Sequence, residues 1–96
     1  MTSSTIAPET TVRISPQVYA RPFGDEIVLL DFGRGEYFGL DEVGAEVWRR
    51  LESGESIGRI ADAIVERYAV SRDDAFRDIV ELVRQMQGES LVTIAC

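Results

Sequence analysis

Few residues in this chain of 96 could do acid–base or nucleophilic chemistry. All ten of its positive charges are arginines, and neither histidine nor lysine occurs. This excludes Ser–His–Asp and Cys–His catalysis, histidine-bound metals and a Schiff-base lysine. The only cysteine, Cys96, cannot form an internal disulfide and is a poor metal site alone. We therefore predict no catalytic residue, no metal, no cofactor and no enzymatic activity.

Three carboxylates, Glu36, Asp41 and Glu42, lie close together in the sequence. Asp41 precedes a helical pattern and is explained as an N-cap, and nothing requires the other two to be buried. The sequence therefore offers candidates for binding rather than for catalysis.

The first candidate is a short aromatic strand predicted over residues 36–40, which contains neither proline nor lysine. An unguarded edge strand of this kind can pair with an extended peptide. Alternation places Glu36 and Phe38 on one face and Tyr37 and Gly39 on the other. The alternative interpretation is structural: Phe38 belongs to the core, and Tyr37 is a half-exposed cover.

The second candidate is one flank of the last predicted helix, where charged residues adjoin apolar ones. Binding there would use an apolar groove rimmed by arginines that pair with carboxylates of a bound segment. The alternative is local ion pairing between residues four apart, each pair contributing only about 0.3–0.5 kcal/mol. The flank consists of Asp73, Phe76, Arg77, Val80 and Arg84.

These candidates are positioned by a predicted α+β fold of winged-helix-like type. Hydrophobic patterns and turn residues predict a three-stranded antiparallel meander followed by three helices. Gly33 and Gly35 are expected to supply positive φ angles in the second turn. The predicted strands are 17–21, 26–32 and 36–40; the helices are 42–52, one after Ser56, and one from Ser71 to Gly88.

Residues 1–12 are rich in serine and threonine and are predicted to be disordered, which leaves residues 13–96 as a single domain. No signal peptide or membrane-spanning stretch is evident, so we expect a cytoplasmic protein with no membrane partner. The net charge of −7 argues against nucleic acid as a partner. A winged-helix DNA-binding regulator is therefore the less favoured alternative.

Two stretches resemble the PqqD family, also called RiPP recognition elements. Val28–Gly54, VLLDFGRGEYFGLDEVGAEVWRRLESG, is similar to the family's strand, glycine turn, YFGL-like strand and first helix. Ser56–Met86, SIGRIADAIVERYAVSRDDAFRDIVELVRQM, is similar to its second and third helices. The likeness covers residues 18–91.

The resemblance implies a non-catalytic module that binds the leader segment of a ribosomally made precursor peptide. It implies that the leader adds as a strand to residues 36–39 beside the third helix. Tyr37 and Phe38 would then supply strand and apolar contacts, and Arg77 and Arg84 would pair with leader acids. The implied setting is lasso-peptide biosynthesis with a separate leader peptidase and cyclase; the alternative is quinone-cofactor biosynthesis with a radical-SAM enzyme. The chain is expected to be a monomer or a homodimer.

Overall fold

The computed structural model describes residues 6–95. It confirms the α+β class, because a three-stranded antiparallel sheet is followed by three helices, and it adds a second, two-stranded sheet. The strands are β1 (Val12–Ile14), β2 (Val18–Phe23), β3 (Glu26–Asp31), β4 (Glu36–Leu40) and β5 (Val92–Ile94), and the helices are α1 (Glu42–Glu52), α2 (Ile57–Arg67) and α3 (Arg72–Gly88).

Each helix begins where the sequence predicts, because a side-chain oxygen accepts a hydrogen bond from a backbone N–H of the first turn. Asp41 Oδ1 accepts from Gly44 at 2.8 Å, before α1. Ser56 and Ser71 do the same at the starts of α2 and α3. The Asp41 cap fixes the point at which β4 turns into α1.

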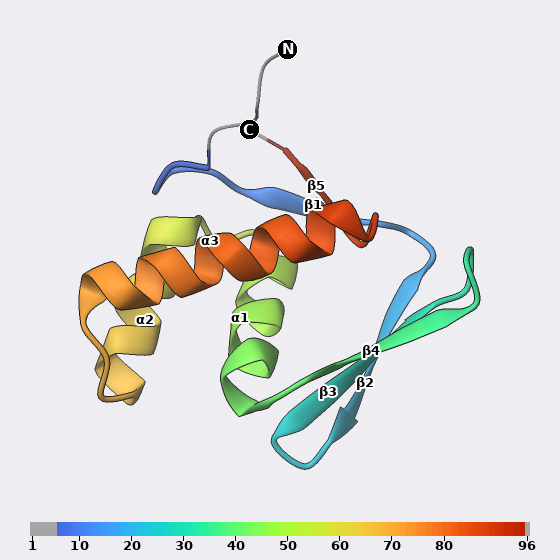
Figure 1. The fold of residues 1–96 in the computed structure, drawn as a ribbon, viewed down its shortest axis with the longest axis horizontal. Helices are drawn as coiled ribbons and strands as arrows, with labels where there is room; N and C mark the ends of the chain where they lie inside the picture. The colour runs from blue at the N-terminus through green and yellow to red at the C-terminus, as the bar shows by residue number, and fades with distance from the viewer. Residues whose placement is uncertain (1–5, 96) are drawn as a thin grey trace.

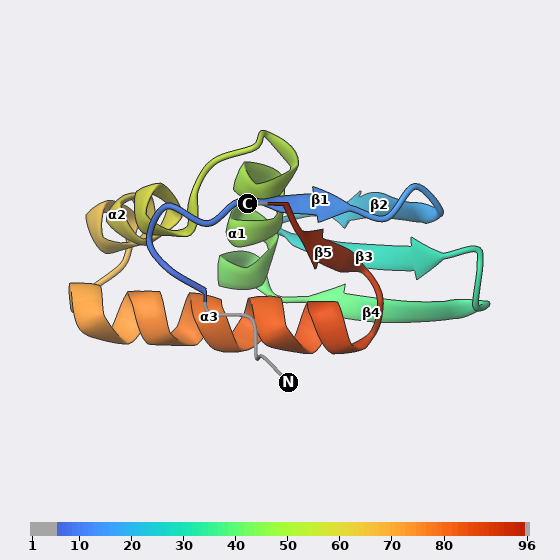
Figure 2. The same ribbon diagram turned by 90° about the horizontal axis from the view of Figure 1, so that it is seen from above.

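The main sheet has the order β2-β3-β4 and packs its inner face on the helices. Figure 1 shows α1 crossing beneath α3 and β4 lying below α3, and in Figure 2 the C-terminal part of α3 lies over β4, the strand farthest from β2. Trp48 of α1 and Leu29 of β3 have no exposed surface, so they mark the centre of the core. The arrangement leaves one side of β4 facing α3.

The turn between β3 and β4 is organised by Asp31, which is 1 % exposed. Its Oδ1 accepts hydrogen bonds from the backbone N–H groups of Gly33 (2.9 Å) and Arg34 (3.2 Å). Gly35 takes the predicted positive φ, at 71°. Gly33 does not; it lies against the side chain of Gln17. A buried carboxylate therefore holds the turn that starts β4.

The prediction of disorder for residues 1–12 is wrong where the structure describes them, and residues 1–5 lie outside the described residues. Ile6 is buried, and Val12 belongs to β1, which pairs with β5. The carbonyls of Pro8 and Thr10 accept hydrogen bonds from Gly58 (2.7 Å) and Ile57 (2.9 Å). These bonds satisfy the free N–H groups at the start of α2, and so the segment belongs to the folded domain.

We expect Gly58→Ala to lower the free energy of unfolding by about 1 kcal/mol, although alanine is favoured in helices. A Cβ at Gly58 would lie 3.0 Å from both the carbonyl oxygen and the Cβ of Pro8. Gly88→Ala is the matched control, because its Cβ would meet nothing within 4 Å. Urea unfolding of both variants measures the difference; equal stability would show that the Pro8 contact is dispensable.

Candidate functional site: the β4–α3 groove

The outer edge of β4 is open. Among residues 6–95, β4 pairs with β3 on one side and with no strand on the other. Neither proline nor lysine occurs in β4, so nothing in its own sequence blocks further pairing. The strand is thus available to an additional extended segment.

The direction of the backbone groups follows from two hydrogen bonds near the turn. Asp31 O accepts from Gly35 N at 2.8 Å on the β4 side, whereas Phe32 N donates to Gln17 O at 3.0 Å on the β2 side. The backbone N–H and C=O groups of successive residues in a strand point to opposite sides of it. With Leu29 opposite Phe38 and Leu30 opposite Tyr37, the backbone groups of Phe38 face β3. Those of Tyr37 and Gly39 therefore point to the open edge.

The side chains of β4 alternate as predicted. Phe38 and Leu40 are half-buried and pack against the core, whereas Tyr37 is 76 % exposed and Gly39 is exposed. The inner side chains thus form the floor beside the open edge, and Tyr37 lies on the outer face.

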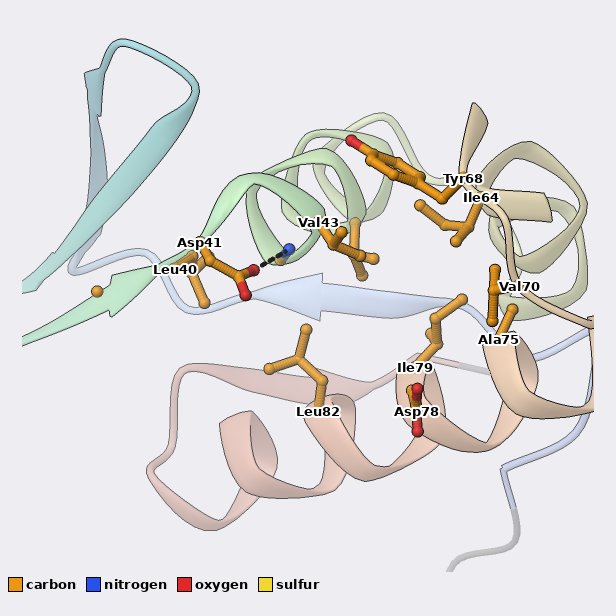
Figure 3. Close-up of a pocket in the computed structure, with 13 residues that line it drawn as sticks. Leu40, Asp41, Val43, Ile64, Tyr68, Val70, Ala75, Asp78, Ile79 and Leu82 are labelled. Atoms are coloured by element: carbon orange, nitrogen blue, oxygen red, sulfur yellow. Dashed lines mark hydrogen bonds between the residues drawn. The ribbon is translucent and has the colours of Figure 1, made fainter. Parts of the chain in front are cut away.

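Two hollows lie between β4 and α3 and share residues, so they form one groove, which we call the β4–α3 groove. The first has a volume of about 610 Å³ and extends toward α1 and α2 (Figure 3). The second has a volume of about 570 Å³ and extends toward the end of α3. Gly39, Leu40 and Leu82 line both. The α3 side is formed by Ala75, Asp78, Ile79, Leu82, Gln85, Met86 and Gly88.

The groove wall is mostly apolar, and two hydrogen bonds hold polar groups near its ends. Tyr68 donates a hydrogen bond from its hydroxyl to Glu42 at 3.3 Å. Desolvation raises the pKa of Tyr68, and the charge of Glu42 raises it further, so the phenol stays protonated and remains a donor. At the other end, Arg34 Nη1 donates to the carbonyl of Glu89 at 3.1 Å, which joins the β3–β4 turn to the end of α3.

The structure brings only part of the predicted site together. Phe38 lines the second hollow and Gly39 lines both. Glu36 and Tyr37 border the open edge without lining either hollow. The predicted α3 residues, Asp73, Phe76, Arg77, Val80 and Arg84, also line neither hollow.

The helical repeat explains why the predicted flank does not meet β4. At about 100° per residue, Asp78, Leu82 and Gln85 share one side of α3, whereas Phe76 and Val80 lie roughly half a turn away. Sequence periodicity indicates an apolar arc on α3 but not which side of that arc borders β4. No sequence signal singled out Asp78, Leu82 or Gln85.

Arg77 has a local partner. It forms an i,i+3 ion pair with Asp74 rather than the i,i+4 pair expected with Asp73. Its hydrogen bond lowers the pKa of Asp74, and the carboxylate in turn raises the pKa of Arg77. A role for Arg77 and Arg84 in pairing with a bound peptide stays a prediction.

In residues 6–95, no helix is both long enough and apolar enough to cross a membrane. Within the same residues, no three His, Cys, Asp or Glu side chains converge as a metal site would require.

Comparison with known proteins identifies the family. The family model described as "Coenzyme PQQ synthesis protein D (PqqD)" matches residues 26–92, which run from β3 to the start of β5. The chain belongs to the PqqD family. No curated protein matches the chain.

Two solved structures are similar to this chain in both fold and sequence. "TbiB1 in Complex with the TbiA(beta) Leader Peptide" is 39 % identical with a TM-score of 0.80, and the match covers 83 % of this chain and 93 % of that one. "Lasso peptide synthetase B1 complexed with the leader peptide" is 32 % identical with a TM-score of 0.80, covering 85 % and 96 %. Both neighbours are described as complexes with a leader peptide.

Proposed function

We propose that this chain is a non-catalytic module that binds the leader segment of a ribosomally made precursor peptide. The leader adds as a strand to the open edge of β4 and places alternate side chains in the β4–α3 groove. The observation that carries the proposal is the free edge, where the backbone groups of Tyr37 and Gly39 adjoin an apolar hollow. Strand addition takes affinity from main-chain hydrogen bonds and specificity from side-chain pockets.

The two structural neighbours support this proposal, because each is described as bound to a leader peptide. They also favour the lasso-peptide setting, in which the captured leader would be delivered to a separate leader peptidase or cyclase. A module of this kind would act in the cytoplasm, where precursor peptides are translated. Delivery and location are parts of the proposal, and so is the state of the module as monomer or homodimer.

A second setting is favoured by the family description, which names coenzyme PQQ synthesis. There the chain would present a precursor to a radical-SAM enzyme. The two settings differ in the peptide that binds, so parallel titrations with a lasso leader and a PQQ precursor peptide separate them. DNA binding has less support, because contacts to phosphates dominate DNA affinity. The helix that would enter the major groove of DNA is α3, and it carries four acids and three arginines.

The direct test is a titration of the fluorescein-labelled leader of the cognate precursor, followed by fluorescence anisotropy. We expect a Kd of about 1 μM or lower, which corresponds to about −8 kcal/mol. A flat titration with the correct leader, at protein concentrations far above micromolar, would refute the proposal.

Two neighbouring exposed residues of α3 test which flank the leader contacts. Gln85 lines the second hollow, and Arg84 belongs to the flank predicted from sequence. We expect Gln85→Trp to fill the groove and weaken leader binding at least tenfold, with an unchanged melting temperature. Arg84→Trp is the matched control and should bind normally. The reverse result would show that the flank containing Asp73, Phe76, Arg77, Val80 and Arg84 is the contact surface.

A further inference from the structure

The charge of the β4–α3 groove is negative. The charged side chains that line its two hollows are Asp41, Asp78 and Glu89, and no described arginine lines either. Asp41 is engaged as the N-cap of α1. Glu89 forms an ion pair with Arg34 at 3.8 Å. Asp78 is the third carboxylate of the groove, and the question is whether it is free to bind a positive charge on the peptide.

Asp78 is exposed and forms no ion pair within the part of the chain that the structure describes. The neighbouring Arg77 pairs with Asp74 instead. The pKa of Arg77 is raised mainly by Asp74 and only to a smaller extent by the charge of Asp78. The carboxylate of Asp78 thus remains available to an incoming cation.

The surface beside Asp78 is apolar. Figure 3 shows Asp78 next to Ile79 on α3, around the same hollow as Leu40, Val43 and Leu82. Val43 is 38 % exposed, so part of its side chain is open to a bound group. A long aliphatic stem would cover these side chains, and a positive charge at its end would meet the carboxylate. Lysine and arginine have this combination of stem and charge.

We infer that the groove selects a leader with a lysine or arginine at a position that packs on Leu82, one helical turn from Asp78, and that Asp78 is the residue that determines this preference. The inference rests on the proposed function and reverses the charge expected from the sequence, in which leader acids meet Arg77 and Arg84. The stem of the basic residue packs on Val43 and Leu82, and its charged end pairs with Asp78.

The test uses a yeast-displayed library of random twelve-residue peptides, selected in parallel on the wild-type chain and on Asp78→Lys. We expect the wild-type chain to enrich peptides with one basic position flanked by apolar ones, and Asp78→Lys to lose that basic preference. Glu81→Lys is the matched control, because it makes the same charge change on α3 outside both hollows. It should retain the basic preference.

An enriched peptide then allows a double-mutant cycle. Replacing its basic residue with norleucine keeps the stem and removes the charge. We expect this change to weaken binding to the wild-type chain by about three- to tenfold, because the bound peptide desolvates the charge pair with Asp78. The same change should have little effect on binding to Asp78→Asn, which has no charge at this position to pair with.

The outcomes separate the inference from the function beneath it. Enrichment of no peptide at all would contradict leader binding itself. Enriched peptides without a basic position, or with the same basic position on Asp78→Lys, would overturn the role of Asp78 and leave strand addition intact. An equal loss of the basic preference in Glu81→Lys would show a general effect of charge on α3, and it would also overturn the role of Asp78.

Discussion

Replacing Tyr37 with proline is expected to reduce leader affinity about a hundredfold while the domain stays folded. The backbone N–H of Tyr37 points to the open edge of β4, so its loss leaves the ladder with β3 intact. The incoming strand would keep an unsatisfied carbonyl, which costs about 1–3 kcal/mol, and would also meet the proline ring. Anisotropy titration gives the affinity, and thermal unfolding shows whether the fold is retained.

Two variants separate the backbone effect from the side chain and from the fold. Tyr37→Ala keeps the N–H and removes a ring that is 76 % exposed, so most of the affinity should remain. Phe38→Pro removes a backbone N–H that faces β3 rather than the open edge, and it should destabilise the sheet itself. Normal leader binding by Tyr37→Pro would rule out strand addition at this edge.

Replacing Trp48 with alanine is expected to destabilise the domain by about 3–5 kcal/mol. Trp48 has no exposed surface and is among the largest fully buried side chains described. A domain of this size has a total stability of about 5–14 kcal/mol, so at the low end of this range the variant would be largely unfolded. Urea denaturation followed by circular dichroism measures the change.

Trp48→Phe is the control that keeps most of the side-chain volume and removes the indole N–H. The indole Nε1 has no hydrogen-bond partner among the described residues, so phenylalanine removes a donor that gains nothing from burial. We expect a loss well below that of Trp48→Ala. A loss under 1 kcal/mol for Trp48→Ala would mean that the core does not depend on this side chain.

The elements set by local signals were the ones that the sequence could predict. Asp41, Ser56 and Ser71 each mark a helix start with a side-chain acceptor, and the structure contains all three caps. The pairing of β1 with β5 joins Val12 to Ile94, and no local pattern encodes a contact across that distance. Residues 6–12 were predicted to be disordered although they are ordered. Their order comes from hydrogen bonds to the start of α2, which is distant in the sequence.

The geometry of the β4–α3 groove was predictable on the β4 side and not on the α3 side. Alternation alone assigns the faces of Tyr37 and Phe38, since a strand has a repeat of two. On α3 the buried centre runs through Ile79 and Val83, and residues on both sides of this line border the apolar arc. Which side meets β4 depends on the rotation of the helix about its axis, which tertiary packing sets.

Pro22, within β2, bears on how many chains can associate. By the alternation that directs Tyr37 outward from β4, the position of Pro22 faces away from β3, so the outer edge of β2 lacks one donor. Polymers that grow head to tail need two competent edges on every subunit. This sheet has one unguarded edge, so we expect strand pairing to end at a 1:1 complex with a peptide or at a closed pair of two copies, and not to extend into a filament.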